Sequence, residues 1–288
     1  MQRLLDVPAP DTSYVAHTRD HDDARGFLLY DGPGRLDGAP VFAVATLGRF
    51  CTNTATGPMH QVWVMRSDLD PLQAAYVTGD DASVCGDCVM RPVLKADGKR
   101  GADMCFVAKH QAPLGVYRAY KRGAYPRLSE RAHKRMAAYS WRFCGYGDTA
   151  VVPLPVWDWA TLHGEGRDMA HTHMWDWAGA LEYASMAMAS VHTPYDAGRA
   201  IAAGWRAYML QPEGLDTPSG MMRCAKQREA KRLQCADCGG CAGTRNGAAR
   251  YGASVAAWIH GPPLKGMNPR DAYAAAYGAA HTVERATA

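Results

Sequence analysis

The sequence lacks any long apolar run, and this absence excludes an integral membrane protein. No part of the 288 residues approaches the ~18–20 consecutive apolar residues of a transmembrane helix. The first residues, Met1–Pro8, also lack the apolar core of a secretory signal. We therefore expect a soluble protein with no membrane partner and a cytoplasmic location, where thiols stay reduced.

The sequence also has little excess charge of either sign. Lys and Arg number 32 against 28 Asp and Glu, which gives a formal net charge of +4. This mildly basic balance permits contact with nucleic acid and does not demand it. Basic residues in two loops, 91–100 and 223–232, could touch phosphates, although a solvated face explains them equally well.

The chain contains no internal repeat and no low-complexity stretch. Its organisation must therefore be inferred from the order of its predicted strands and helices. Strand candidates alternate with helix candidates at the pace of βαβ units, which predicts an α/β fold with a parallel sheet. About six such units predict a (β/α) barrel or partial TIM-like barrel, with function at the carboxyl ends of its strands. Cysteine-rich loops attached to it would bind metal.

Three parts are expected along the chain. Residues 1–50 are rich in Pro and Gly and are predicted to form an irregular N-terminal segment. Residues 51–261 should form the barrel-like domain with two cysteine metal sites. Residues 262–288, rich in Ala, Gly and Tyr, should form a C-terminal tail.

The most specific motif in the sequence is a group of four cysteines, Cys224, Cys235, Cys238 and Cys241. The last three follow C-x2-C-x2-C spacing. Thiolates two residues apart can turn toward one metal centre, and the glycines between them allow the tight curl this requires. The spacing suits an iron–sulfur cluster or zinc and does not separate the two. Alternatively, three cysteines and His260 would form a Cys3His zinc site, which would leave Cys224 spare; free or disulfide-linked cysteines are the weaker interpretation.

A second group contains three cysteines, Cys85, Cys88 and Cys105, in C-x2-C-x16-C spacing. Three thiolates leave one coordination position open, as catalytic metal sites need. An open iron of a cubane cluster can bind S-adenosylmethionine or a substrate hydroxyl, although the C-x3-C-x2-C motif usual in radical enzymes is absent. Two alternatives stay open: His110 completes a structural zinc site, or Cys85 and Cys88 act as a redox dithiol.

Two further candidates follow predicted strands. Asp148 ends the run Gly145-Tyr146-Gly147-Asp148, where it could bind a ribose or amine or act as base or nucleophile, or only cap the next helix. His171 and His173 alternate along a strand, so both can face the same side. His173 is the stronger candidate for metal or polar ligand binding; a hydrogen-bonded core histidine is the commoner outcome.

The order of several short motifs is specific. Over about residues 52–261 they are Thr56-Gly57-Pro58-Met59 before Gln61-Val62-Trp63; Cys85-Gly86-Asp87-Cys88; Cys105-Phe106-Val107; Val116–Gly123 with Tyr125-Pro126; Tyr146-Gly147-Asp148 with Val152-Pro153; Thr172-His173 with Trp175; Met188–Val191; Gly204-Trp205-Arg206; and Cys224 with the C-x2-C-x2-C run. In this order the sequence resembles a family of cysteine-rich proteins of bacteriophages, archaeal viruses and prophages. The resemblance implies a radical-SAM-like or transglycosylase-like barrel that binds metal, in the host cytoplasm if the protein is viral.

The chain departs from this family pattern at some positions. Ala225 stands where the family usually has Pro, and His192 stands where it has Asp, which weakens His192 as a catalytic candidate. Cys51 and Cys144 lie outside the pattern, in agreement with their isolated spacing.

Three functions are compatible with these motifs. The first is an iron–sulfur enzyme with one or two clusters, in which Asp148 and His173 handle a small-molecule substrate, a nucleotide or a nucleic-acid base. The second is a zinc-containing, transglycosylase-like base-exchange enzyme that modifies DNA or tRNA, with Asp148 as nucleophile. The third is a non-catalytic, zinc-stabilised protein that binds nucleic acid or a host partner.

Overall fold

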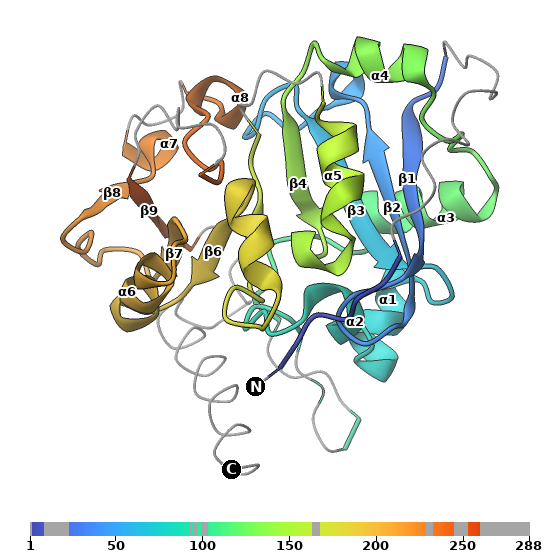
Figure 1. Ribbon diagram of the computed structural model, residues 1–288. Helices are drawn as coiled ribbons and strands as arrows, with labels where there is room; N and C mark the ends of the chain where they lie inside the picture. The colour runs from blue at the N-terminus through green and yellow to red at the C-terminus, as the bar shows by residue number, and fades with distance from the viewer. Residues whose placement is uncertain are drawn as a thin grey trace.

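The computed structural model describes residues 2–8, 23–92, 94, 97–98, 103–162, 168–228, 233–244 and 253–259. Over these residues the chain is a mixed α/β protein with two sheets (Figure 1). The strands are β1 Gly26–Pro33, β2 Pro40–Thr46, β3 His60–Arg66, β4 Trp141–Tyr146, β5 His171–Thr172, β6 Met188–Val191, β7 Ala207–Gln211, β8 Met221–Arg223 and β9 Ser254–Trp258. The helices are α1 Pro71–Gln73, α2 Ala82–Cys85, α3 Ala112–Lys121, α4 Glu130–Met136, α5 Leu154–Ala160, α6 Pro194–Ala202, α7 Ala225–Arg228 and α8 Cys235–Cys238, with short turns η2 Gly48–Phe50, η3 Ala74–Thr78, η4 Thr149–Val151 and η5 Ala180–Ser185.

The first sheet has the order β1-β2-β3-β4. The strands β1, β2 and β3 pair antiparallel, and β4 pairs parallel with β3. Residues Val41–Ala45 of β2 are fully buried, because both faces of the sheet are covered, and such strands contain near-continuous apolar runs.

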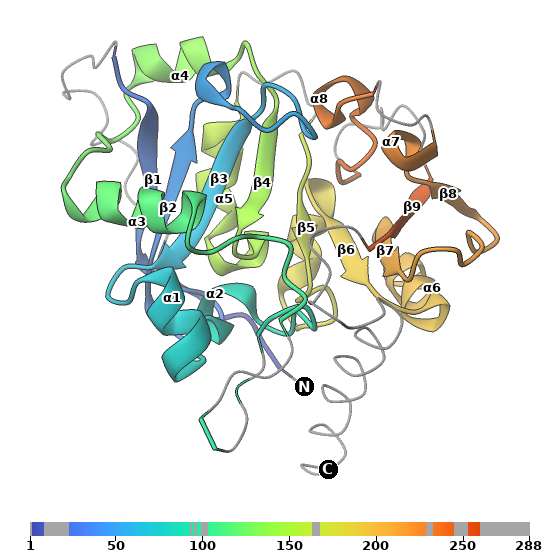
Figure 2. The same ribbon diagram turned by 180° about the vertical axis from the view of Figure 1, so that it is seen from behind.

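The second sheet has the order β5-β6-β7-β9-β8, and all its neighbouring strands are parallel. A parallel bridge between Arg142 of β4 and Met169 joins it to the first sheet. There the Phe143 N–H donates to the Met169 carbonyl at 2.9 Å, and the Met169 N–H donates to the Trp141 carbonyl at 2.7 Å. Each pair of neighbouring strands from β3 to β8 in this order is therefore parallel, and β3 and β4 end on the side of the molecule where α2 lies (Figure 2).

The expected (β/α) barrel needs a correction, because the described strands form two open sheets and no closed barrel. The order of strands ends at β1 on one side and at β8 on the other. The chain begins with an antiparallel hairpin, β1–β2, whose short turn cannot replace the helical crossover between parallel strands. β5 and β8 have only 2 and 3 residues. Strands this short cannot pair along the full height of a barrel. The α/β class and the parallel sheet are confirmed.

The N-terminal part also differs from the expectation. Residues 1–50, expected to be irregular, contain β1 and β2, because the run Phe27–Tyr30 supplies buried apolar side chains. Gln2–Leu4 pairs with the loop after β5: the Leu4 N–H donates to the Ala178 carbonyl at 3.0 Å. The predicted tail, residues 262–288, lies outside the described residues.

Local sequence signals set several helix ends. Asp70 caps α1 and accepts the Leu72 and Gln73 N–H groups at 2.9 and 3.0 Å, with Pro71 at the first helical position. Gly204, with φ of 95°, follows α6 where a left-handed residue is needed. None of the helices in the described ranges combines the length and apolar character that a bilayer crossing requires.

Candidate active site

Three polar side chains follow three neighbouring parallel strands. Asp148 follows β4, His173 follows β5 and His192 follows β6. The Asp148 N–H donates to the Val84 carbonyl at 2.7 Å, which brings α2 and the first cysteine group to the same edge. The carboxyl ends of parallel strands are where α/β proteins bind their ligands, so this edge is the candidate active site.

Asp148 is only 4% exposed, and both its carboxylate oxygens are engaged. Oδ1 accepts the Ala150 N–H at 2.9 Å and caps η4, as the alternative interpretation of this residue predicted. Oδ2 accepts the His173 N–H at 2.8 Å and lies 3.7 Å from His173 Nδ1. The carboxylate is thus arranged to hold His173 in place.

The glycines before Asp148 serve the sheet. Gly147 has φ of 81°, and a Cβ atom there would lie 2.5 Å from the Val64 carbonyl oxygen. A Cβ at Gly145 would lie 2.5 Å from the Val62 carbonyl oxygen. The close approach they allow is between β4 and β3.

His173 and Cys88 form an interacting pair. Burial lowers the pKa of His173, but the Cys88 and Asp148 charges and hydrogen bonds outweigh it and raise the pKa to about 10. Burial raises the pKa of Cys88, but the charge and hydrogen bond of His173 outweigh it and lower the pKa. The His173 ring stacks on His192 at a centroid distance of 5.5 Å. The ends of β5 and β6 and the loop that contains Cys88 therefore meet at His173.

His171, the other histidine of β5, has a different environment. Its ring stacks on Tyr208 of β7 at a centroid distance of 4.1 Å. Burial, then the charges of Arg142 and His173, lower its pKa to about 3. The surroundings of His171 and His173 therefore shift the pKa values of the two rings in opposite directions.

Three cysteines were predicted to act together. Cys85, Cys88 and Cys105 are half-buried, and their charges interact. Burial, followed by the Asp81, Cys88 and Cys105 charges, raises the pKa of Cys85 well above its usual value. Within the described part of the chain, no three His, Cys, Asp or Glu side chains stand close enough to hold one metal ion.

Other features of this site are compatible with a metal cluster, which is larger than a single metal ion and is bound by thiolates. The Tyr146 side chain is 3% exposed, and its buried hydroxyl has no hydrogen-bond partner among the described residues. After burial, the charges of Cys85, Asp81 and Cys105 raise the pKa of Tyr146, so the phenol lies beside the thiols. Thiolates are the ligands of iron–sulfur clusters, so the donor set and the buried orphan hydroxyl fit such a group.

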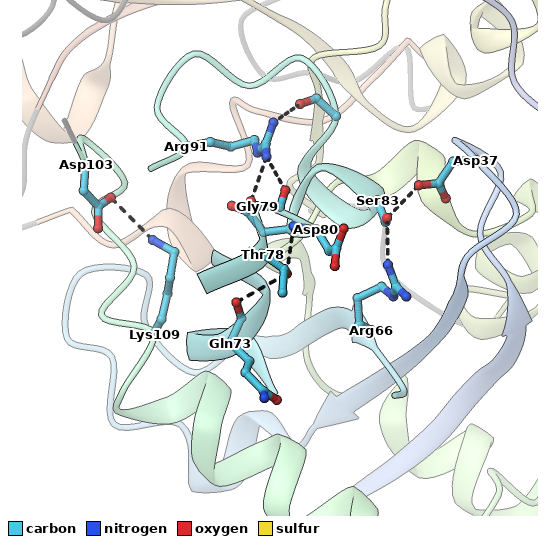
Figure 3. A network of polar contacts seen from close by, with 12 residues as sticks. Asp37, Arg66, Gln73, Thr78, Gly79, Asp80, Ser83, Arg91, Asp103 and Lys109 are labelled. Carbon is cyan, nitrogen blue, oxygen red and sulfur yellow. Dashed lines mark hydrogen bonds and ion pairs between the residues drawn. The ribbon is translucent and has the colours of Figure 1, made fainter. Parts of the chain in front are cut away.

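Two cations flank the cysteines. Lys109 is 1% exposed and lies 3.5 Å from Asp103; burial lowers its pKa, but the Cys105 and Asp103 charges outweigh this and raise it. Arg91 donates to Asp81 at 2.7 Å and to the Gly79 carbonyl at 2.9 Å, which ties down the cysteine loop (Figure 3). These cations can balance anionic thiolates. Sequence reasoning missed Lys109, whose only signal is its place four residues after Cys105.

The four-cysteine loop lies at the opposite edge of the sheets. The Ala236 N–H donates to the Thr56 carbonyl, before β3, at 2.8 Å, and the Gly243 N–H donates to the Met186 carbonyl, before β6, at 3.0 Å. In both views α8 lies at the upper edge and α2 at the lower edge (Figures 1 and 2). The part of the loop from Cys235 to Gly243 therefore contacts the segments before β3 and β6, whereas Cys224 follows the carboxyl end of β8.

The cysteines of this loop are partly brought together. Burial, then the charge of Cys224, raises the pKa of Cys235 to about 11, and Cys238 contributes in the same direction. Arg206 fixes the stretch around Cys241 by donating to the Gly240 carbonyl at 2.9 Å, and to the Ala242 and Ala253 carbonyls. Of the alternative ligands, His110 is exposed and His260 lies outside the described residues.

Comparisons of the chain with known protein families, with curated proteins and with solved structures find no match.

Proposed function

We propose that the protein is an iron–sulfur enzyme whose active site lies at the carboxyl ends of β3–β6. One observation carries this proposal: Cys85, Cys88 and Cys105 lie close enough for their charges to interact, and Cys88 interacts with His173, which Asp148 holds. A site of this kind at this edge of a parallel sheet is typical of enzymes, whereas a structural metal site has no need of an adjacent histidine–carboxylate pair.

We propose a cluster at the three thiols in preference to a single zinc ion. Sulfur ligands of one tetrahedral zinc ion lie about 3.8 Å apart, and no three ligand side chains among those described stand close enough for one ion. A cubane cluster is larger and accepts ligands that are further apart. Lys109 and Arg91 supply positive charge around such an anionic group.

An iron–sulfur cluster with three cysteine ligands would supply electrons, or an open iron that binds a substrate or S-adenosylmethionine. The chain's own residues do the rest. His173 holds a proton on a buried imidazole, and Asp148 fixes the orientation of that ring. Tyr146 offers a buried hydroxyl as a further hydrogen-bond donor.

The finer fold proposal is a partial barrel whose polar inner surface leads to this site. Arg142 donates to Gln61 Oε1 at 2.9 Å, and His171 stacks on Tyr208 beside it. Polar side chains on neighbouring strands suit a substrate that carries several hydrogen-bonding groups. A nucleotide or a nucleic-acid base is the substrate class we propose to test first.

One observation weighs against a transglycosylase-like enzyme. Its nucleophile would be Asp148, whose two oxygens already accept backbone N–H groups at 2.9 and 2.8 Å. For the four-cysteine loop we propose a structural zinc or a second cluster, because its part from Cys235 to Gly243 contacts the segments before β3 and β6. The same loop would stabilise a non-catalytic protein.

Anaerobic purification tests the proposal. One cluster would give a brown protein with about four iron and four sulfide per chain, and two clusters about twice as much. Cys85→Ala should remove the iron of one cluster, whereas the control Cys51→Ala should leave the metal content unchanged. A colourless protein that contains only zinc would overturn the proposal, and a base-exchange assay on duplex DNA and tRNA would then test the second function.

A further inference from the structure

A separate cavity of about 600 Å³ lies open to the surface of the molecule. It lies between the loop that follows β5, the turn η5 and the helix α6. Such a volume is in the range that holds small organic ligands. The side chains that matter for its chemistry are Trp175, Asp176, Trp177, Leu181, Arg199 and Trp205.

Three indole rings line this cavity from two distant segments. Trp175 and Trp177 are half-buried in the loop after β5, and Trp205, 3% exposed, precedes β7. Indole faces attract cations more strongly than the other aromatic rings do. The guanidinium of Arg199 already lies against one face of Trp175, with its carbon 5.2 Å from the ring centroid, so a ligand cation would use the other indole faces or displace Arg199.

The charged side chains around the cavity determine whether it favours a positively or a negatively charged ligand. Asp176 belongs to the lining and lies 3.8 Å from Arg199, and Asp196 lies 3.5 Å from the same guanidinium. Asp87 reaches the site through Trp177, whose Nε1–H donates to Asp87 Oδ2 at 2.7 Å. Three carboxylates therefore stand against one guanidinium here, which disfavours an anionic ligand and favours a cation.

We infer that this cavity binds an organic cation, such as a quaternary ammonium or an alkylated amine, against Trp175, Trp177 and Trp205 beside Asp176. The cation would lie on the indole faces, and Asp176 would supply the opposite charge. Binding here needs no metal, so this inference stands or falls independently of the proposed iron–sulfur function.

The cavity is also connected to the cysteine loop. Asp87, the acceptor of the Trp177 N–H, lies between Cys85 and Cys88 in the sequence. A ligand that contacts Trp177 therefore lies one hydrogen bond away from the loop of the candidate active site.

Fluorine NMR of protein labelled with fluorotryptophan tests the inference, because each of the eight tryptophans gives its own resonance, assigned by Trp→Phe substitution. Choline is the probe, and its neutral carbon isostere, in which a carbon replaces the nitrogen, is the matched control. We expect choline to shift the resonances of Trp175, Trp177 and Trp205 and to leave that of Trp258 unchanged. The neutral isostere should bind about tenfold more weakly or worse.

Variants sharpen the test. Trp175→Leu and Asp176→Asn should each weaken choline binding about tenfold, whereas Trp159→Phe, outside the cavity lining, should not change it. Equal binding of choline and its isostere would overturn the inference, because the site would then be merely apolar. Binding of adenosine monophosphate in place of choline would overturn it too, as would the absence of any shift at saturating choline.

Discussion

The Asp148 carboxylate binds His173 twice: Oδ2 accepts the backbone N–H at 2.8 Å and lies 3.7 Å from the ring Nδ1. One side chain thus fixes both the backbone and the ring of the histidine that follows the next strand. This connection between two strand ends gives the candidate active site its shape. It also separates two possible roles of Asp148, because a positioning residue and a nucleophile respond differently to substitution.

Replacement of Asp148 should reveal its positioning role. Asp148→Ala leaves the N–H groups of Ala150 and His173 without acceptors in a buried place, and we expect a loss of roughly 2–4 kcal/mol in the free energy of unfolding. Asp148→Asn keeps one acceptor oxygen and should lose less than half of that. Urea denaturation measures both. Equal losses in the two variants would show that the hydrogen bonds accepted by Asp148 do not account for the loss of stability.

His60 should make the protein sensitive to acid. Its Nδ1 accepts the Gly48 N–H at 3.0 Å and its Nε2 faces the Met136 carbonyl at 2.9 Å, so the neutral ring fits the site. Burial lowers its pKa from 6.5 to about 4. The unfolded chain therefore binds a proton first, and stability that is complete above pH 6.5 falls by roughly 3 kcal/mol as the pH drops to about 4.

Urea midpoints measured between neutral pH and the pKa of folded His60 check this expectation. His60→Gln keeps hydrogen-bonding capacity without a titrating group, so its stability should depend less steeply on pH over the same interval. An unchanged pH dependence in His60→Gln would assign the acid sensitivity to another group.

Gly147 should tolerate no side chain. Its φ of 81° opposes Gly147→Ala, and so does the distance of only 2.5 Å that would separate the alanine methyl carbon from the Val64 carbonyl oxygen. We expect a loss of at least about 2 kcal/mol. Gly198→Ala is the matched control, because Gly198 lies in α6 with open space around it, and alanine should stabilise that helix by up to about 1 kcal/mol. Thermal melting of both variants gives the comparison, and a tolerated Gly147→Ala would contradict the close packing of β4 on β3.

Arg206 should be essential for the four-cysteine loop. The side chain is 7% exposed and donates to the carbonyls of Gly240, Ala242 and Ala253. Arg206→Ala would leave these acceptors unpaired, and we expect a loss of roughly 3 kcal/mol or more together with loss of metal from the loop. Arg118→Ala, at an exposed position of α3, should change stability by less than about 0.5 kcal/mol. Metal analysis and urea denaturation test both; full metal content in Arg206→Ala would contradict the role of this arginine.

Part of this arrangement could be predicted from the sequence, because it depends on short-range patterns. The strand that precedes Asp148 and the spacing of Cys85, Cys88 and Cys105 placed candidate residues at one edge of a sheet. The cap of Asp70 on α1 followed from the same local chemistry. What could not be predicted depends on pairing between distant segments: the hairpin of β1 and β2, the two-residue length of β5, and the hydrogen bond between Asp87 and Trp177, 90 residues apart.

The roles of individual groups were also partly hidden. Gly145 and Gly147 could be interpreted as glycines that admit a ligand, and only the position of β3 shows that they admit its backbone. Lys109 looks like any surface lysine in the sequence. Its burial follows from the fold of the segment between Asp103 and α3, which no local pattern specifies.

The position of β9 has a consequence for how the chain folds during synthesis. β9 is the last described strand in the sequence, yet it lies between β7 and β8 in the second sheet. Until Ser254–Trp258 has left the ribosome, β7 and β8 have no common neighbour, and their unpaired edges stay exposed. Pairing over such sequence distances is slow and favours aggregation of incomplete chains. The first sheet can therefore form while translation continues, whereas the second must wait for nearly the whole described chain.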